Sequence, residues 1–593
     1  GIAYLYRMRG ERANNPELAI AAFKEALEVY TRDAVPEYWA GIQNNLGLAY
    51  SDRIKNERAD NLESAIEAFK LSLEEYTRDA FPEDWANTQN NLGAAYYDRI
   101  LGERADNLEL AIAALNLSLK VYTRDAFPEQ WAGTQNNLGA AYYDRILGER
   151  ANNLELAIVA YNQSLEVYTP TAFPIDCLRT GRNLGNTANF IKDWETAIKG
   201  YNLAIEAVEN IRLEALNPQR QQEILSDAMD VYHGIVQSYL NLNQPDRALE
   251  YVERSKTRYL VQLLTDRGLY PKGNIPPTII TELDRLRRAI IGEEQRLAIQ
   301  EQTRNRGEIL TLDQQRQPIL NDSTHLNHLK QELNQFIASK ITPIDPTFSL
   351  NQKVESIPLS EIQSLIDQDT AILEWYIGGD SIMAFIVTNE GLIPPNPPSK
   401  GGNFDSEVKG VKVWQSSAED RGKLINFIKD YRDAYENNKT EWINNLNDCL
   451  NQLSEILSID ELLELIPKSC SRLILIPHWF LHIIPLHCLP LKNGQFLYQR
   501  FTKGVGYVPS CQLLKLVKLS QRENFTRLFA IKNPTRKDLK PLLGANLEIE
   551  RISQGFATEK NHYYWGIRSI RKNPRKPSSR VTSISLSSLF LSW

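Results

Sequence analysis

The sequence predicts an all-α superhelix of repeated helix pairs followed by an α/β domain. Three observations carry this prediction. A glycine-centred segment recurs every 46 residues, apolar residues follow each copy at helical spacing, and the second half alternates strand-like with helix-like runs. Self-similarity at a fixed period of this size is typical of repeat arrays. The chain, at 593 residues, is also too long to fold around a single core.

The recurring segment reads Gln-Asn-Asn-Leu-Gly-x-Ala-Tyr and stands at residues 43–50, 89–96 and 135–142. Apolar residues then follow at i, i+4 and i+8, as in Ala65, Phe69 and Leu73, which is one face of a helix. Each unit is therefore two helices, and neither buries its apolar face without stacked neighbours. The recurring glycine falls at Gly1, Gly47, Gly93, Gly139 and Gly185.

Punctuation residues mark the helix ends within each unit. Asn61 and Asn107 are expected to cap the second helix, and Pro82 and Pro128 to begin the join to the next unit. The chain starts inside a first helix without Met, so we expect further sequence before it. Residues 1–265 are thus predicted to hold six units, the first and last of them imperfect.

The pattern Leu-Gly-x-x-Tyr followed by Ala-x-x-x-Phe/Tyr resembles the tetratricopeptide (TPR) repeat. The usual unit has about 34 residues, and the surplus here enlarges the inner turn and the join. The resemblance implies that first helices line a concave groove, at places three residues before the glycine and four or five after it. The predicted peptide-binding residues at these places are Asn44, Asn90, Asn136, Arg182, Tyr97, Tyr143, Asp98 and Asp144.

A ladder of asparagines suits a peptide, because each amide offers one acceptor and two donors to an extended backbone. It resembles the asparagine ladder of kinesin-light-chain-type repeats. The alternative is that Asn44, Asn90 and Asn136 only hydrogen-bond the adjacent repeat. The second asparagine of each copy (Asn45, Asn91, Asn137) is expected to be structural.

Composition excludes several classes of function. Charged residues make up 24% of the chain, and the net charge of -7 argues against a nucleic-acid or membrane-surface role. The five cysteines form no CxxC pair, which predicts neither zinc site nor disulfide framework and suits a reducing cytoplasm. We therefore expect a cytoplasmic protein with a protein or peptide partner and no cofactor, metal, nucleic acid or membrane, its oligomeric state left open.

The second half is predicted to begin with a helical connector over 266–348. Two β-rich runs joined by Gly-Gly-Asp then predict a hairpin. Further strands and helices alternate after it, which indicates an α/β domain. The strands are expected at 371–377, 381–387, 472–477, 505–508 and 527–531, and the helices at 418–435, 439–457, 511–519 and 547–556.

Residues 471–491, 506–514 and 533–535 follow the motif order of the CHAT domain, a caspase-like module found after TPR arrays. The segment Ala-Leu-Glu-Tyr-Val-Glu-Arg-Ser-Lys at 248–256 is also typical of it. This resemblance covers 248–556, with the domain itself at 349–556. It implies a caspase-like fold in which a histidine base activates a cysteine nucleophile.

The catalytic pair has no counterpart after Phe556, so the sequence predicts an incomplete domain without catalytic residues. Residues 557–593 are basic and Ser-rich and are expected to be an aberrant, disordered tail. His233, ahead of Gly234, is interpreted as packing within a repeat helix. His478, His482, His487 and Cys488 are interpreted as core or loop packing rather than as a zinc site or a dyad.

These features together predict a protein-interaction module whose groove binds a partner and couples it to an inactive CHAT domain. One alternative is a partner-regulated caspase-like cysteine peptidase, if the true reading frame is intact. The other is a pure scaffold.

Overall fold

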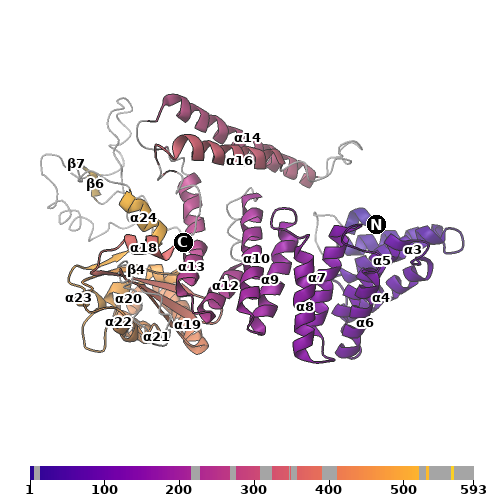
Figure 1. The fold of residues 1–593 in the computed structure, drawn as a ribbon, viewed down its shortest axis with the longest axis horizontal. Coiled ribbons are helices and arrows are strands. Elements are labelled where there is room, and N and C mark those ends of the chain that lie inside the picture. The colour runs from indigo at the N-terminus through magenta and orange to yellow at the C-terminus, as the bar shows by residue number, and fades with distance from the viewer. Residues whose placement is uncertain are drawn as a thin grey trace, which may run out of the picture.

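A computed structural model describes residues 1–5, 14–214, 228–266, 271, 275–306, 324–345, 348, 357–389, 410–519, 529–532 and 562–565. Paired helices run through the first part of the chain, and a mixed sheet with its helices forms the second (Figure 1). This confirms the predicted fold class. The predicted helix at 547–556 lies outside the described residues.

The array is a row of antiparallel helix pairs in which each pair packs on the next (Figure 1). Its helices are α1 (Ile2–Leu5), α2 (Asn15–Val29), α3 (Pro36–Ser51), α4 (Arg58–Glu75), α5 (Pro82–Asp98), α6 (Arg104–Ser118), α7 (Pro128–Asp144), α8 (Arg150–Leu165), α9 (Pro174–Phe190), α10 (Trp194–Glu214), α12 (Met229–Asn241) and α13 (Pro245–Asp266). No strand occurs in the described residues before 260.

The recurring glycine lets the two helices of a unit approach closely. A Cβ placed on Gly93 of α5 would lie 2.7 Å from Cγ of Leu115 on α6, which is closer than carbon atoms pack. Gly47 and Gly139 meet Phe69 and Tyr161 in the same way. The period in the sequence is therefore a period of close helix contacts.

The enlarged inner turn folds back over the start of the second helix. Nδ2 of Asn107 donates to the carbonyl oxygen of Leu101 at 2.9 Å, and Gly102 adopts a left-handed φ of 81°. Since α6 begins at Arg104, Asn107 is inside the helix, and its predicted role as a cap is wrong. The same holds for Asn61 in α4. Pro82 begins helix α5 itself rather than the join.

The connector is a pair of long helices, α14 (Pro277–Arg306) and α16 (Thr324–Phe336), followed by a π-helical turn at Ile337–Ile341. They pack through two apolar clusters, one around Leu283 and one around Ile290. An ion pair of 3.1 Å joins Nη2 of Arg285 to Oε1 of Glu332.

The sheet has five strands in the order β3-β2-β1-β4-β5, with β1 and β2 antiparallel and β1, β4 and β5 parallel. Its strands are β1 (Thr370–Ile377), β2 (Ile382–Val387), β3 (Val411–Gln415), β4 (Arg472–Ile476) and β5 (Val505–Tyr507). The hairpin and the later strands agree with the sequence prediction, whereas β3 was missed.

Helices cover both faces of the sheet. On β1, Leu373 and Trp375 pack against α19 (Ala418–Asn437), α21 (Leu446–Ile456) and α22 (Ile459–Leu465). Ile372 and Tyr376 point the other way and share one core with α12 and α13 of the array, α18 (Leu359–Ser364) and α24 (Cys511–Leu519). The remaining short helices are α20 (Lys439–Asn444), α23 (Leu497–Arg500) and the 3-10 turns Trp479–Ile483 and Leu486–Cys488.

A second, two-stranded sheet pairs β6 (Phe529–Lys532) with β7 (His562–Trp565) in parallel. Strand β7 falls within 557–593, for which the sequence predicted no regular structure. That prediction is wrong for these four residues, which pair with β6 along their whole length. The rest of 557–593 lies outside the described residues.

Candidate functional site

A cavity of about 260 Å³ opens between the first helices of three successive units, α5, α7 and α9. Amides and hydroxyls dominate its lining, and Gly133 of α7 has no side chain to fill the space. The lining residues are Asn87, Asn90, Tyr122, Glu129, Gln130, Gly133, Thr134, Asn137, Tyr168 and Arg179. Of the predicted peptide-binding residues, this cavity contains Asn90.

The asparagines of neighbouring units form hydrogen bonds with each other. Oδ1 of Asn90 accepts from Nδ2 of Asn137 at 3.2 Å, and Oδ1 of Asn44 accepts from Nδ2 of Asn91 at 3.1 Å. These are the hydrogen bonds to the adjacent repeat that the alternative interpretation of the asparagines required. Only the carbonyl oxygens of Asn44 and Asn90 are used, however. Within the described part of the chain, their NH₂ groups have no protein acceptor.

Asn136 differs from its two counterparts. It is 4% exposed, and its Oδ1 accepts from Oγ1 of Thr180 on α9 at 3.1 Å. Its side chain therefore lies between α7 and α9, where a ligand in the groove does not reach it. The predicted place of Asn136 on the concave surface is wrong, because the packing of α9 covers it.

The tyrosines and aspartates join units near the ends of the first helices. Oη of Tyr97 donates to Oδ2 of Asp144 at 2.6 Å, and the guanidinium of Arg104 lies 4.9 Å from the Tyr97 ring centre. Burial and this hydrogen bond raise the pKa of Tyr97. Asp98 similarly pairs with Arg58 at 3.2 Å.

The last two predicted residues also have partners. The Arg150 guanidinium stacks 5.0 Å from the ring centre of Tyr143. Nε of Arg182 lies 3.0 Å from Oδ2 of Asp230 and ties α9 to α12. Arg182 thus connects one unit to the next, whereas the contact of Tyr143 with Arg150 joins the two helices of its own unit.

A row of ion pairs follows the inner turns between the two helices of each unit, along an edge of the array that we call the turn edge. Arg99 donates to both carboxylate oxygens of Glu63, at 2.7 and 2.8 Å, and Arg53–Glu17 and Arg145–Glu109 repeat this contact. The hydrogen bond from Arg99 lowers the pKa of Glu63. Sequence reasoning missed this row, although its arginines and glutamates recur at the same 46-residue period.

The junction between array and sheet contains buried charges. Nζ of Lys256 on α13 lies 2.7 Å from Oε1 of Glu374 on β1 and donates to the carbonyl oxygen of Trp375 at 2.6 Å. The two side chains are 6% and 0% exposed. Removing one partner of such a pair is strongly destabilising, because the other charge stays buried without compensation.

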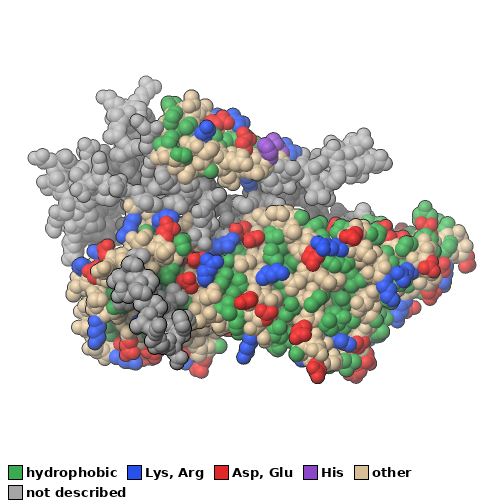
Figure 2. All heavy atoms as spheres, viewed as in Figure 1, with side chains coloured by type: hydrophobic (Ala, Val, Ile, Leu, Met, Phe, Trp, Pro, Cys, Tyr) green, Lys and Arg blue, Asp and Glu red, His purple; other side chains and the backbone are tan. Residues whose placement is uncertain are grey.

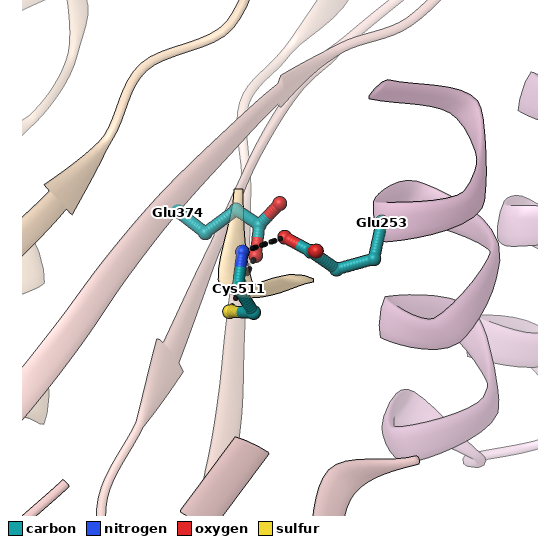
Figure 3. Close-up of side chains that lie close together, drawn as sticks. All are labelled: Glu253, Glu374 and Cys511. Carbon is teal, nitrogen blue, oxygen red and sulfur yellow. Dashed lines mark hydrogen bonds between the residues drawn. The ribbon is translucent and has the colours of Figure 1, made fainter. Parts of the chain in front are cut away.

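Glu253 lies one helical turn before Lys256 and meets the start of α24. One carboxylate oxygen accepts from the backbone N–H of Cys511 at 2.9 Å (Figure 3). The other accepts from the backbone N–H of Gln512 at 3.3 Å, and a helix N-terminus favours a carboxylate at this place. Burial, and then the charge of Glu374, raise the pKa of Glu253 well above its usual value. Burial therefore disfavours the ionised form of Glu253, while the hydrogen bond from Cys511 partly offsets this effect.

Glu253, Glu374 and Cys511 each bring one possible ligand atom within 4.8 Å of the others (Figure 3). The ammonium of Lys256 already neutralises Glu374, and burial raises the pKa of the Cys511 thiol well above its usual value. A metal would need a thiolate and two free carboxylates. These residues fit an internal ion pair better than a metal centre.

His233 of α12 also contacts the sheet. Its Nε2 lies 2.8 Å from Oδ1 of Asp380 in the turn after β1, and its ring stacks at 6.5 Å on Tyr376. Nearby, Nε2 of Gln415 on β3 donates to Oε1 of Gln237 on α12 at 2.8 Å. These polar contacts join α12 of the array to the turn between β1 and β2 and to β3.

The histidines after β4 have structural contacts. Nδ1 of His478 accepts from the backbone N–H of Ile377 at 3.0 Å, and burial lowers the pKa of His478 well below its usual value. The ring of His487 lies 2.9 Å from Oη of Tyr507. Burial raises the pKa of the Cys488 thiol, which opposes the formation of a reactive thiolate.

The charge pattern of the surface is mixed. In the face shown in Figure 2, acidic and basic side chains are interspersed over the array, with no continuous basic stripe of the kind that binds nucleic acid. Among the described helices, none of 18 residues or more is apolar enough to cross a membrane.

Comparison with known families agrees with the fold of the second part. Residues 447–576 match the family model of the CHAT domain. The chain carries a C-terminal CHAT domain. The match runs past Phe556, where the sequence analysis ended the resemblance, and it does not include residues 248–446. The CHAT domain is a caspase-like module, and the repeats before it are TPR-like helix pairs.

The solved structures that match this chain have low similarity to it. The crystal structure of BtubC (BKLC) from P. vanneervenii has a TM-score of 0.30 and 17% identity, over 44% of this chain and 96% of that chain. Two crystal structures of MamA have TM-scores of 0.22 and 0.24, each at 16% identity, over 36% and 40% of this chain and 93% and 100% of theirs. Such TM-scores carry no argument about fold or function. The comparison with curated proteins gave no match.

Proposed function

We propose that this chain is a protein-interaction module in which the groove of the TPR-like array binds an extended peptide segment and couples it to the CHAT domain. One observation carries the proposal. Asn44 and Asn90 are fixed through their oxygens by the next unit, while their NH₂ groups keep both donors. Asn90 presents its donors to a polar cavity between three units.

The chemistry of these amides suits a peptide backbone. An extended peptide offers carbonyl oxygens along its length, and each NH₂ group donates to one of them. Because Asn91 and Asn137 hold the amides in place, little side-chain freedom is lost on binding, and such preorganisation favours affinity. Tyr97, Asp98 and Asp144 would act by keeping the units in register, and Tyr143 by joining the two helices of its own unit.

Coupling would pass through the last helices of the array. Arg182 on α9 pairs with Asp230 on α12, and His233 on the same helix pairs with Asp380 beside β1. Lys256 and Glu253 on α13 then reach Glu374 and the start of α24. A shift of α9 on peptide binding thus has a connected route of polar contacts to the CHAT sheet.

We further propose that this chain, which we place in the cytoplasm, has no peptidase activity of its own. Support comes from the thiols, because burial raises the pKa of Cys177, Cys449, Cys488 and Cys511. Labelling by a thiol-directed peptidase probe should not exceed that of Cys488→Ser. Strong labelling that this substitution removes would instead favour the peptidase alternative.

The peptide proposal is tested by two aspartate substitutions and one alanine control. Asn44→Asp and Asn90→Asp keep the oxygen that accepts from the next unit and remove the free donors. Asn91→Ala breaks the bond to Asn44 and leaves the donors of Asn44 in place. Random peptides are selected by display on the full chain and measured by fluorescence anisotropy at two salt concentrations.

We expect the combined Asp variant to lose about tenfold or more in affinity, since each donor to a carbonyl contributes roughly 1 kcal/mol. Asn91→Ala should weaken binding much less than the combined Asp variant, because it removes only the preorganisation of Asn44 and keeps every donor. Equal binding by all three proteins would overturn the peptide groove and leave only the inter-repeat role of the asparagines.

A further inference from the structure

The fourth complete unit of the array places a positively charged side chain in the groove. Six residues before the recurring glycine, the first three complete units have Gly41, Asn87 and Gly133, and the fourth has Arg179. Arg179 lines the same cavity as Asn90. Among the lining residues it is the sole cation, at the α9 end of the space.

The guanidinium of Arg179 forms one exposed ion pair with a residue of its own helix. Its Nη2 lies 2.8 Å from Oδ1 of Asp176, one turn earlier on α9, and the two side chains are 55% and 35% exposed. An exposed pair of this kind contributes about 0–1 kcal/mol and exchanges readily for another carboxylate. Arg182, by contrast, forms an ion pair with Asp230 on the next unit.

The space beside Arg179 is kept open by the chain itself. A Cβ on Gly133 would lie 2.9 Å from Oη of Tyr168, and that hydroxyl donates to the carbonyl oxygen of Glu129 at 3.2 Å. A side chain at position 133 would therefore crowd the wall between Asn90 and Arg179. The cavity continues from the amide donors to the cation.

We propose that the groove selects peptides with an aspartate or glutamate side chain, whose carboxylate binds Arg179 while the peptide backbone binds Asn90. This inference rests on the proposed function and adds the chemistry of the partner. A planar guanidinium binds a carboxylate through two parallel hydrogen bonds. One cation beside Asp176 and Glu129 suits a monoanion better than a doubly charged phosphate.

The test uses the full chain and three fluorescein-labelled nonapeptide libraries. They are the same mixture of Gly, Ala, Ser and Thr, except that the central residue is Glu, Gln or Lys. Arg179→Gln removes the cation. Arg124→Gln is the matched control, because Arg124 makes an exposed ion pair with Glu166 and does not line the cavity. Asp176→Asn frees Arg179 from its local partner.

We expect the Glu library to bind about tenfold more tightly than the Gln library, as a charge-assisted contact predicts. Arg179→Gln should remove this preference and leave binding of the Gln library within about twofold. Arg124→Gln should preserve it, and Asp176→Asn should increase affinity for the Glu library alone.

A Glu preference that is absent, or that persists in Arg179→Gln, overturns the inference. If the Gln library then still binds and Asn44→Asp with Asn90→Asp weakens it, the peptide groove stands without its acidic selectivity. If none of the libraries binds, the proposed function fails, and the inference fails with it.

Discussion

At the turn edge of the array, Arg99 and Glu63 form a two-pronged ion pair that is 26% and 33% exposed and recurs in neighbouring units. At the junction, Lys256 and Glu374 form a pair at the same distance of 2.7 Å that is almost fully buried and occurs once. The atoms meet in similar geometry in both places. Their surroundings differ, and this difference decides what each pair does.

Exposed pairs are screened by water and salt, and each contributes little. Because they repeat, they set the spacing of units without fixing any one of them firmly. The buried pair has no water to replace a lost partner. The junction should therefore behave as a rigid link between the array and the CHAT sheet.

The largest effect is expected from Lys256→Met. It leaves the Glu374 carboxylate buried without a counter-charge and should cost about 3–5 kcal/mol in urea unfolding. The matched control is Lys423→Met, whose exposed pair with Glu419 is expected to contribute less than about 1 kcal/mol. The double variant Lys256→Met with Glu374→Met should recover most of the loss. Equal small losses at Lys256 and Lys423 would erase the contrast between junction and surface.

Gly93→Ala tests the packing inside a unit, with an expected loss of about 1–3 kcal/mol from the clash with Leu115. Gly422→Ala on α19 has no atom within 4 Å of the added Cβ and should stabilise by about 0.5–1 kcal/mol. Opposite signs for one chemical change would show that the glycine period encodes contact rather than flexibility. Similar values would contradict this.

These contrasts show which parts of the molecule the sequence specifies locally. Gly93 and Leu115 lie in one repeat, so the repeat pattern by itself predicts that their two helices touch. The buried run 472–476 likewise predicted β4. The start of the second helix could not be predicted in this way. Asn107 has the residue type and position of a cap, and only the path of the turn over the helix shows that Asn107 lies inside the helix.

Contacts between distant parts of the chain could not be predicted in this way. The segment with Glu253 and Lys256 looked typical of the family, but its role depends on Glu374 and Cys511, far along the chain. Strand β3 was missed because Lys412 interrupts its short apolar run. In the groove, the amide of Asn136 was assigned correctly to a helix and wrongly to its surface, since neighbour packing decides burial.

The pH dependence of two carboxyls should have opposite signs. Because burial raises the pKa of Glu253 above 4.5 in the folded state, its contribution is full below pH 4.5 and is lost as pH rises through the raised pKa. Glu253→Gln has no proton to lose. Its stability relative to the unchanged chain should therefore improve from pH 4 to pH 7 in urea titrations. A constant difference over this range would mean that Glu253 is ionised in the fold.

The smallest effect is expected from Glu63→Gln. The pKa of Glu63 is lowered from 4.5, so its pair contributes above pH 4.5 and is lost as pH falls. The variant should lose at most about 1 kcal/mol at pH 7, less at high salt and almost nothing in acid. A loss that neither salt nor acid reduces would place this pair with the junction rather than with the surface.

The central claim is that peptide binding in the groove reaches the CHAT sheet through α12 and α13. Amide hydrogen exchange of the full chain, with and without a peptide selected on it, tests this directly. We expect slower exchange in α5, α7 and α9 and also in α13 and β1, with the change in β1 lost in Lys256→Met while the peptide stays bound. Slower exchange confined to the groove helices of the unchanged chain would contradict the coupling.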